Sequence, residues 1–168
     1  MSRPPFLVPI AELAQRPGAR QRLRLAGPLP GLELSSARLT DRDVVADVVL
    51  ESLGETMTVT GTATGWWEGE CRRCLETTGG ELTVQLSEVF EPRPTEGETY
   101  PLGRDALDLE PVLREALALA LPLAPLCDEA CAGPDPDAHP VGIADDEVDE
   151  AEPPTDPRWG ALDVLRFD

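Results

Sequence analysis

Apolar and polar residues alternate through much of the first half of the chain, which is the pattern of half-buried β-strands. Between residues 20 and 27, "RQRLRLAG" places Leu23 and Leu25 on one face and arginines on the other. The next alternating segment lies at residues 43–51. Its apolar residues share one face: Val44, Ala46, Val48 and Leu50. Each segment is therefore predicted to be a strand with one face turned to a core, and Gly54-Glu55 is predicted to turn the second strand into an antiparallel neighbour.

Two longer alternating segments flank a pair of cysteines. Threonines alternate with small or apolar residues from residue 56 to residue 64. After the cysteines, one face of residues 81–90 carries Leu82, Val84, Leu86 and Phe90. The sequence "CRRC" at residues 71–74 is thus predicted to lie between two antiparallel strands, at the end of a hairpin. Metal-binding knuckles are built from short turns of this kind.

The clearest helical pattern follows the strands, at residues 109–121. Asp108 can cap this helix, Pro111 is tolerated in its first turn, and the helix is expected to stop before Pro122. Its apolar face consists of Val112, Leu113, Ala116, Leu117 and Ala120. The preceding segment, residues 91–106, is predicted to be a loop because it is rich in proline and glycine.

These elements predict an α+β fold, mainly an antiparallel sheet of five or six strands covered by one helix. A short strand at residues 6–8 and a helical turn that begins with Pro9 precede the sheet. We expect a single domain over residues 1–131, and a disordered, acidic and proline-rich segment over residues 132–155. A short C-terminal helix is predicted over residues 156–168.

Charge is distributed unevenly along the 168 residues, whose net charge is -18. Residues 1–43 hold seven arginines and four acidic residues, whereas residues 128–156 hold eleven acidic residues and no arginine. Phosphate binding needs a cationic surface, so this balance argues against a protein that wraps nucleic acid over its whole surface. The acidic run is interpreted as a solvated tail, and the alternative is a tail that mimics nucleic acid or docks on a basic partner.

The hydropathy of the chain predicts the cellular compartment of the protein. The chain has no run of about 20 apolar residues, which a membrane-spanning helix needs. Its start, "MSRPPFLVPIAEL", lacks the apolar region and cleavage site of a signal peptide. A cytoplasmic protein with no membrane partner is predicted, and disulfides are rare in that reducing compartment.

The four cysteines form two close pairs, Cys71 with Cys74 and Cys127 with Cys131, separated by a gap of 52 residues. If the two pairs meet in space, four thiolates can hold one structural zinc ion. Two alternatives stay open: buried or idle thiols, and a thiol-based redox couple. The only histidine, His139, lies in the acidic run, so no catalytic constellation or small-molecule substrate is predicted.

Four segments together carry a resemblance to a known family: the cysteine pair "CRRC", the strand end "EVFEP", the helix "LDLEPVLREALALALPLAPLC" and the terminal "DPRWGALDVL". Their order and spacing resemble the YceD-like large ribosomal RNA subunit accumulation protein family, from about Phe6 to Leu165. The resemblance implies a non-enzymatic bacterial cytoplasmic factor for accumulation of 23S rRNA. The positions that match the family motif are Cys71, Arg73, Cys74, Cys127, Cys131, Asp156, Pro157 and Arg158.

The chain departs from the family at one point. Many members have a further cysteine pair after the position of Cys131, whereas this chain continues with "AGPDPDAHPVG". The resemblance leaves the partner open between an rRNA precursor and a large-subunit ribosomal protein. Direct RNA contact would use the candidate contact residues Arg22, Arg24, Arg72 and Arg73, with Arg20 beside them. Protein contact would use the acidic segment against a basic ribosomal protein. The alternative function is a thiol-based redox or metal-sensing regulator.

Overall fold

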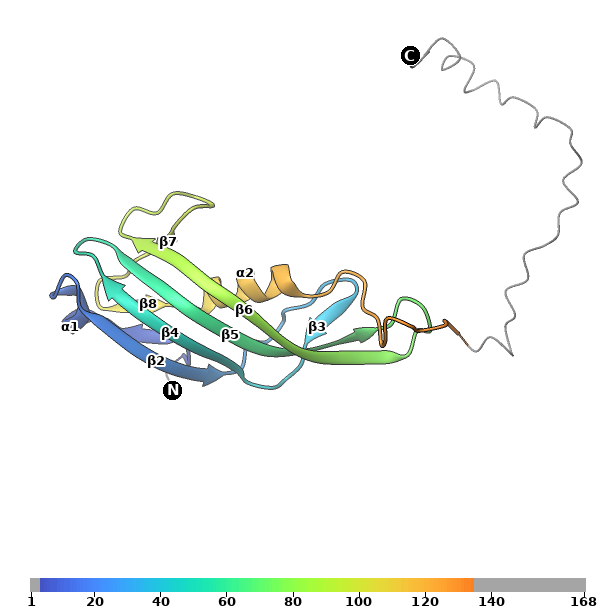
Figure 1. Cartoon of the computed structure of the whole chain (residues 1–168). Coiled ribbons are helices and arrows are strands. Elements are labelled where there is room, and N and C mark those ends of the chain that lie inside the picture. The colour runs from blue at the N-terminus through green and yellow to red at the C-terminus, as the bar shows by residue number, and fades with distance from the viewer. Residues whose placement is uncertain (1–3, 135–168) are drawn as a thin grey trace, which may run out of the picture. The chain divides into compact units, whose positions relative to one another are not determined.

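The computed structural model describes residues 4–134 (Figure 1), all of which belong to one compact unit. Most of the predicted acidic segment, with His139, and all of the predicted C-terminal helix lie outside the described residues. No helix within residues 4–134 is long and apolar enough to cross a bilayer.

A six-stranded sheet dominates the fold, with strands β2, β4, β5, β6 and β7 side by side and β3 paired to β5. The strands are β2 (Arg20–Gly27), β3 (Ala37–Leu39), β4 (Val44–Ser52), β5 (Met57–Glu70), β6 (Thr77–Glu91) and β7 (Tyr100–Pro101). All pairings in this sheet are antiparallel except that of β6 with β7. The predicted α+β class with a mainly antiparallel sheet is confirmed.

Period-two burial explains the two faces of the sheet. The predicted inner-face residues of β4 are all buried: Val44, Ala46, Val48 and Leu50. Met57, Val59 and Ala63 of β5 and Leu86 and Phe90 of β6 are buried on the same face. The threonines of β5 lie on the opposite face, where Thr64 and Thr83 share a hydrogen bond of 3.0 Å. One face therefore forms the core and the other meets solvent.

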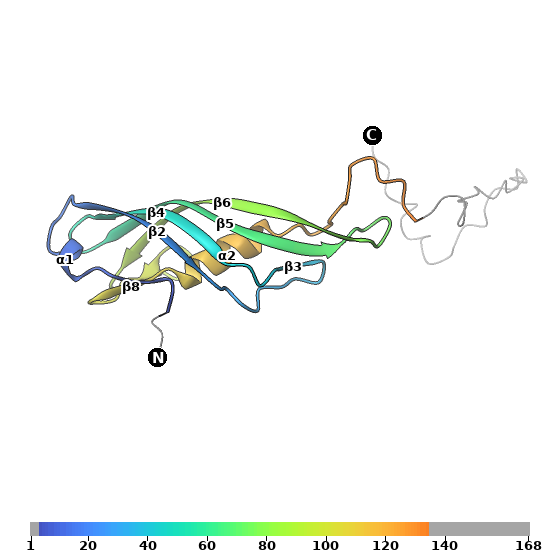
Figure 2. The same ribbon diagram turned by 90° about the horizontal axis from the view of Figure 1, so that it is seen from below.

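The hairpin of β5 and β6 is longer than the rest of the sheet. Its register runs without interruption from Met57 opposite Phe90 to Glu70 opposite Thr77. β4 pairs with the first part of β5, and β3 pairs with its last part, at residues 67–69. The far end of the hairpin therefore extends past β4, as both views show (Figures 1 and 2). The first cysteine pair lies in the turn at this end, between β5 and β6.

A second, two-stranded sheet pairs β1 (Leu7–Pro9) with β8 (Ala106–Asp108). Pro9 is the last residue of β1 and Ile10 caps α1 (Ala11–Ala14), so the prediction that Pro9 begins the helical turn is wrong. The predicted loop at residues 91–106 contains β7 and the first residue of β8. Composition missed these short strands because distant partners hold them: Ala106 pairs with Pro9.

Helix α2 (Glu110–Ala120) covers the inner face, packing on β6 and β5. Pro111 lies in the first turn, as predicted. Leu109 and not Asp108 is the N-cap residue, so the predicted cap is wrong, although Asp108 Oδ1 accepts the Glu110 N–H at 3.0 Å. Val112, Leu113 and Leu117 are buried against the sheet. The helix ends before Leu121 and Pro122. The segment that follows α2 runs to the end of the β5–β6 hairpin (Figure 2).

Candidate metal centre

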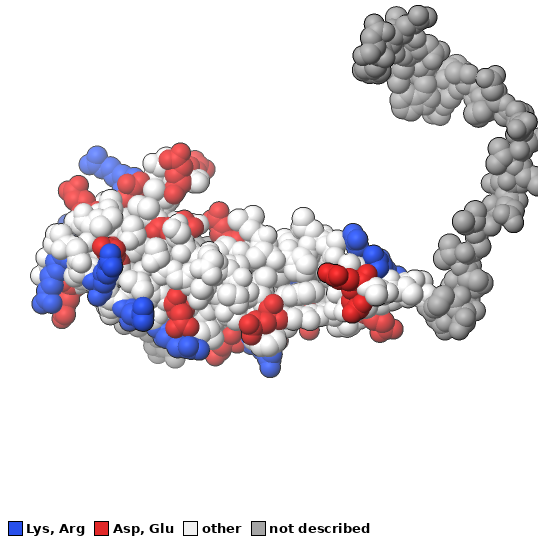
Figure 3. Space-filling model, viewed as in Figure 1, with Lys and Arg blue, Asp and Glu red and all other residues white. Residues whose placement is uncertain are grey.

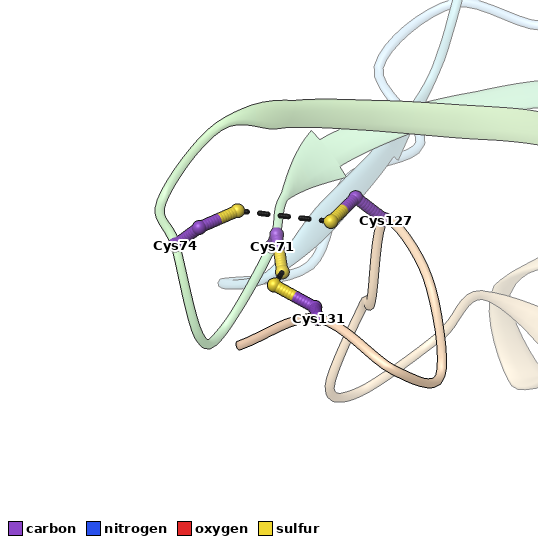
Figure 4. A group of neighbouring side chains, drawn as sticks. All are labelled: Cys71, Cys74, Cys127 and Cys131. Atoms are coloured by element: carbon purple, nitrogen blue, oxygen red, sulfur yellow. Dashed lines mark hydrogen bonds between the residues drawn. The ribbon is translucent and has the colours of Figure 1, made fainter. Parts of the chain in front are cut away.

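A tight turn joins β5 to β6 and holds the first cysteine pair. The Cys71 N–H donates to the Glu76 carbonyl at 2.9 Å, and the Leu75 N–H donates to the Cys71 carbonyl at 2.9 Å. Leu75 has φ 64°, the left-handed region that a leucine rarely adopts. This reversal brings the chain back within six residues and directs the side chains of Cys71 and Cys74 to the same side of the turn (Figure 4).

The second pair lies in a loop after α2. Asp128 organises this loop, because its Oδ1 accepts the Ala130 N–H at 2.7 Å and its carbonyl accepts the Cys131 N–H at 3.1 Å. The result is a second short turn, which presents Cys127 and Cys131 toward the hairpin (Figure 4).

The two turns bring all four sulfurs together, as the zinc hypothesis requires. Cys71 Sγ lies 3.9 Å from Cys131 Sγ, and Cys74 Sγ lies 3.7 Å from Cys127 Sγ. All four sulfurs lie within 4.8 Å of one another. The cysteines are free, and these distances far exceed the about 2.05 Å of a disulfide.

The sulfur cluster fits a tetrahedral metal ion. With a Zn–S distance of about 2.3 Å, a regular tetrahedron separates its sulfurs by about 3.8 Å. The two sulfur distances above lie on either side of this value. Within residues 4–134 this is the only group of three or more histidine, cysteine or acidic side chains arranged to hold a metal. The four cysteines can therefore hold one ion.

Neighbouring groups in the cluster shift the pKa values of the thiols in opposite directions. Backbone N–H groups of Cys74, Cys127 and Arg73 lower the pKa of the Cys71 thiol to about 6, outweighing its burial. Contacts with the thiols of Cys131, Cys74 and Cys71 raise the pKa of Cys127 to about 12. Four negative charges at such distances need a cation, so metal binding would release the remaining protons.

Arg73 connects the two turns through its side chain. Its Nη1 donates to the Glu129 carbonyl at 2.9 Å and to the Cys131 carbonyl at 2.8 Å. The backbone of Arg72 makes a third link, because its N–H donates to the Pro125 carbonyl at 2.9 Å. These bonds position the second cysteine pair against the first.

The segment between α2 and Cys127 is also held against the sheet. Ser36 Oγ donates to the Pro122 carbonyl at 2.9 Å. A Cβ atom at Gly69 would lie 2.4 Å from the Ser36 carbonyl oxygen and 3.3 Å from Pro125, so only glycine allows this close approach. The cysteine loop is thus delivered to the hairpin by packing as well as by hydrogen bonds.

The four candidate contact arginines do not form one patch. Arg24 lies opposite Asp47 and makes a 3.2 Å ion pair with it. Asp47 lies opposite Thr62 of β5, eight residues before Glu70, which is about 26 Å at about 3.3 Å per residue. Arg22 and Arg24 therefore lie far from the cysteine turn.

Arg72 and Arg73 lie at the cysteine turn, and both are exposed. The guanidinium of Arg73 is already engaged by two carbonyls, whereas Arg72 forms its contact through the backbone. Sequence reasoning identified the four cysteines but not this use of Arg73, nor the contact of Ser36. The proximity of Arg73 to the cysteines was visible in the sequence, whereas nothing in the sequence pointed to Ser36.

The fold and the cluster define a β-rich α+β protein with a candidate four-thiolate metal centre. The family model described as "Large ribosomal RNA subunit accumulation protein YceD" matches residues 59–166, which include all four cysteines. The chain belongs to this family, whose description assigns a ribosome-related role and names no enzymatic reaction.

Curated relatives come from mycobacteria. An uncharacterized protein of Mycobacterium tuberculosis and one of Mycobacterium bovis are each 36% identical over 170 residues, covering 94% of this chain and 80% of the relative. An uncharacterized protein of Mycobacterium leprae is 31% identical over 140 residues, covering 77% of this chain and 64% of the relative. No solved structure matches the chain at a significant level.

Proposed function

We propose that the protein is a non-enzymatic cytoplasmic factor in biogenesis of the large ribosomal subunit, acting as a binding module that promotes accumulation of 23S rRNA. Family membership is the observation that carries this proposal. The partner is a large-subunit ribosomal protein or an rRNA precursor.

We further propose that Cys71, Cys74, Cys127 and Cys131 hold one structural zinc ion. The support is the sulfur cluster itself, with pair distances of 3.7 and 3.9 Å between two otherwise separate turns. Four thiolates fill a tetrahedral shell and leave no open position for a substrate, which is the usual structural type of zinc site. The ion would fix the loop after α2 to the hairpin.

Metal content tests the zinc proposal. Protein purified without chelator should contain about one zinc per chain by elemental analysis, as one four-cysteine site requires. The variant Cys127→Ser, Cys131→Ser should lose it. The matched variant Ser36→Ala removes a hydrogen bond of the same loop without touching a thiol and should retain zinc. Wild-type protein that carries no metal would refute the zinc proposal.

Deletion of the gene in its host tests the ribosomal function. The ratio of 23S to 16S rRNA should fall in the deletion strain and recover when the wild-type chain is supplied. An unchanged ratio would refute the function whatever the metal content, because the two proposals make separate predictions.

The choice between RNA and protein contact has its own test. Arg22, Arg24 and Arg72 can be replaced by glutamine together, while Arg73 is kept because it holds the cysteine loop. If the variant no longer binds rRNA, and if the affinity of the wild-type protein for rRNA falls steeply as salt is raised, the contact is direct. Unchanged retention would exclude contact through these arginines. We favour protein contact because Arg24 is paired with Asp47 and the net charge is -18.

The alternative is a thiol-based redox or metal-sensing regulator. The redox couple of this alternative is Cys71 with Cys74, whose sulfurs lie within 4.8 Å of each other. The pairs Cys71–Cys131 and Cys74–Cys127 are also close enough to join after a small movement. Mild oxidation of the native protein should then form reversible disulfides, with a loss of two mass units for each. An intact mass that stays unchanged would exclude this alternative.

A further inference from the structure

The two outer long strands of the sheet differ in how their free edges are protected. β2 pairs only with β4 and carries Arg20, Arg22 and Arg24 on one face, where Arg20 and Arg24 form ion pairs with Glu51 and Asp47 of β4. Charged side chains of this kind discourage the addition of another strand. β6 is the long strand at the other side, and its own edge has a different character.

β6 pairs with β5 from Thr77 to Phe90 but with β7 only at Phe90 and Glu91. Within the described residues, the edge from Thr77 to Val89 therefore has no strand partner (Figure 1). The Glu91 carbonyl accepts the Leu102 N–H on the β7 side at 2.9 Å, so the backbone of Glu91 points away from β5. Because alternate residues repeat this direction and the register is continuous, Gln85 also points its N–H and carbonyl outward.

A groove lies between this free edge and α2. Its apolar lining comes from Val84 on β6 and from Val112, Ala116 and Leu119 on α2. Leu119 is 82% exposed, which is unusual for a leucine on the covering helix. A neighbouring hollow continues the groove toward β7 and shares Glu88, Tyr100 and Glu115 with it.

The lining of the groove is acidic. Glu88 and Glu115 line both the groove and the neighbouring hollow, Glu98 lines the hollow, and neither lining contains an arginine or a lysine. Glu115 accepts a hydrogen bond from the Tyr100 hydroxyl at 2.6 Å, which leaves its charge uncompensated. None of the three glutamates forms an ion pair within residues 4–134. Acidic side chains are visible along this side of the body (Figure 3).

We propose that the free edge of β6 and its acidic groove bind an extended, basic segment of a partner protein, which adds to the sheet as a further strand. The proposal rests on the proposed function as a binding module and names its partner surface. Charge decides between occupants: nucleic acid and a second copy of this chain, with its net charge of -18, would both be repelled by the three glutamates.

Strand geometry specifies the sequence of the partner segment. Backbone hydrogen bonds to the edge at Gln85 supply affinity that does not depend on sequence. Alternate side chains of the added strand would face α2, where an apolar residue meets Val84 and Leu119 and a basic residue meets Glu88 and Glu115. The remaining side chains would continue the threonine-rich outer face.

Synthetic peptides test the surface directly. The probe is the labelled nonapeptide Thr-Val-Thr-Val-Thr-Lys-Thr-Lys-Thr, together with its reverse because either strand direction is possible. Fluorescence anisotropy with the full-length chain should show saturable binding of at least one of them. A peptide with glutamate in place of lysine should bind at least about tenfold more weakly, since like charges across an interface oppose binding.

Variants locate the binding. Glu88→Gln with Glu115→Gln should weaken binding by about tenfold, and Gln85→Pro should do the same by removing an outward N–H at an edge position. The matched control Glu12→Gln with Glu55→Gln changes the net charge equally at exposed positions elsewhere and should change affinity by less than about twofold. Thermal melts verify that each variant is folded.

Two binding results would each overturn the proposal: neither peptide binds, or the control pair weakens binding as much as the groove pair does. The groove pair should also fail to restore 23S rRNA in the deletion strain. If it restores the ratio fully, the surface is not the one used and the proposal is overturned, while the ribosomal function stands. If deletion itself has no effect on rRNA, the ribosomal function fails, and peptide binding alone then decides the surface.

Discussion

The body of the protein and the end of its long hairpin are held together by different forces. In the body, the inner face of the sheet and α2 bury a continuous cluster of aliphatic and aromatic side chains. In the hairpin end, which we define as residues 68–79, Cys71 is the only buried residue. The body is therefore held by apolar burial, whereas the hairpin end is held by its strand pairing and by sulfur, backbone and guanidinium contacts to the loop after α2.

Side-chain truncation should give the largest difference between the two regions in the free energy of unfolding. Phe90 is fully buried and its ring packs on Tyr100 with centroids 5.4 Å apart. Phe90→Ala should lower the free energy of unfolding by about 3–5 kcal/mol, since it removes apolar burial and leaves a cavity. In the hairpin end, Leu75→Ala should change it by less than about 0.5 kcal/mol, because Leu75 is 70% exposed. Denaturant unfolding measures both, and equal losses would contradict the contrast.

Metal removal should have the next largest effect, and a local one. After treatment with a chelator, the amides of Cys71 and Arg72, which bond across the hairpin end, should exchange hydrogen at least about tenfold faster. The amides of Val48 and Val59 in the body should change by less than about twofold. Exchange measured by NMR would distinguish this from global unfolding, in which both groups accelerate together.

The same contrast explains what could be predicted from sequence. The long strands and α2 were predictable because their apolar residues repeat with the period of the structure and face one core. β3 and β7 were not, because two or three residues carry no measurable period and a distant strand decides their pairing.

In the site, residue type and pair spacing identified the four thiols as candidate ligands, but not whether they meet. The gap of 52 residues is bridged by α2 and by the contacts of Ser36 and Gly69, which leave no pattern in the sequence. The direction of the Arg73 side chain is equally invisible, because it depends on where the second turn lies.

Arg73 provides a sharper test of the hairpin end than the cysteines themselves. Arg73→Ala removes two hydrogen bonds to the second cysteine turn and should weaken zinc affinity by about tenfold or more, measured by competition with a chromophoric chelator. Arg72→Ala is the matched control, because Arg72 contributes its backbone N–H and should leave the affinity nearly unchanged. If the two variants behaved alike, Arg73 would act only through its charge.

The smallest expected effect lies at the rim of the body, at Glu88. Burial, and then the charge of Glu115, raise the pKa of Glu88. The folded state thus holds this proton more tightly than the unfolded chain, and stability that is present below the unfolded pKa, about 4.3, is lost as pH rises through the folded pKa. Glu88→Gln should therefore stabilise the protein at pH 7, with the gain disappearing below about pH 4.

A double-mutant cycle divides this gain between its two causes. In a Glu115→Gln background the repulsion from Glu115 is absent, so the gain from Glu88→Gln should be smaller but should not vanish, because burial remains. Thermal melts at pH 4 and pH 7 measure both steps. A gain at pH 7 that is unchanged in this background would mean that burial acts alone. In that case Glu88 and Glu115 do not repel each other measurably. A basic ligand would then gain less binding energy by relieving this repulsion than the short distance between the two carboxylates suggests.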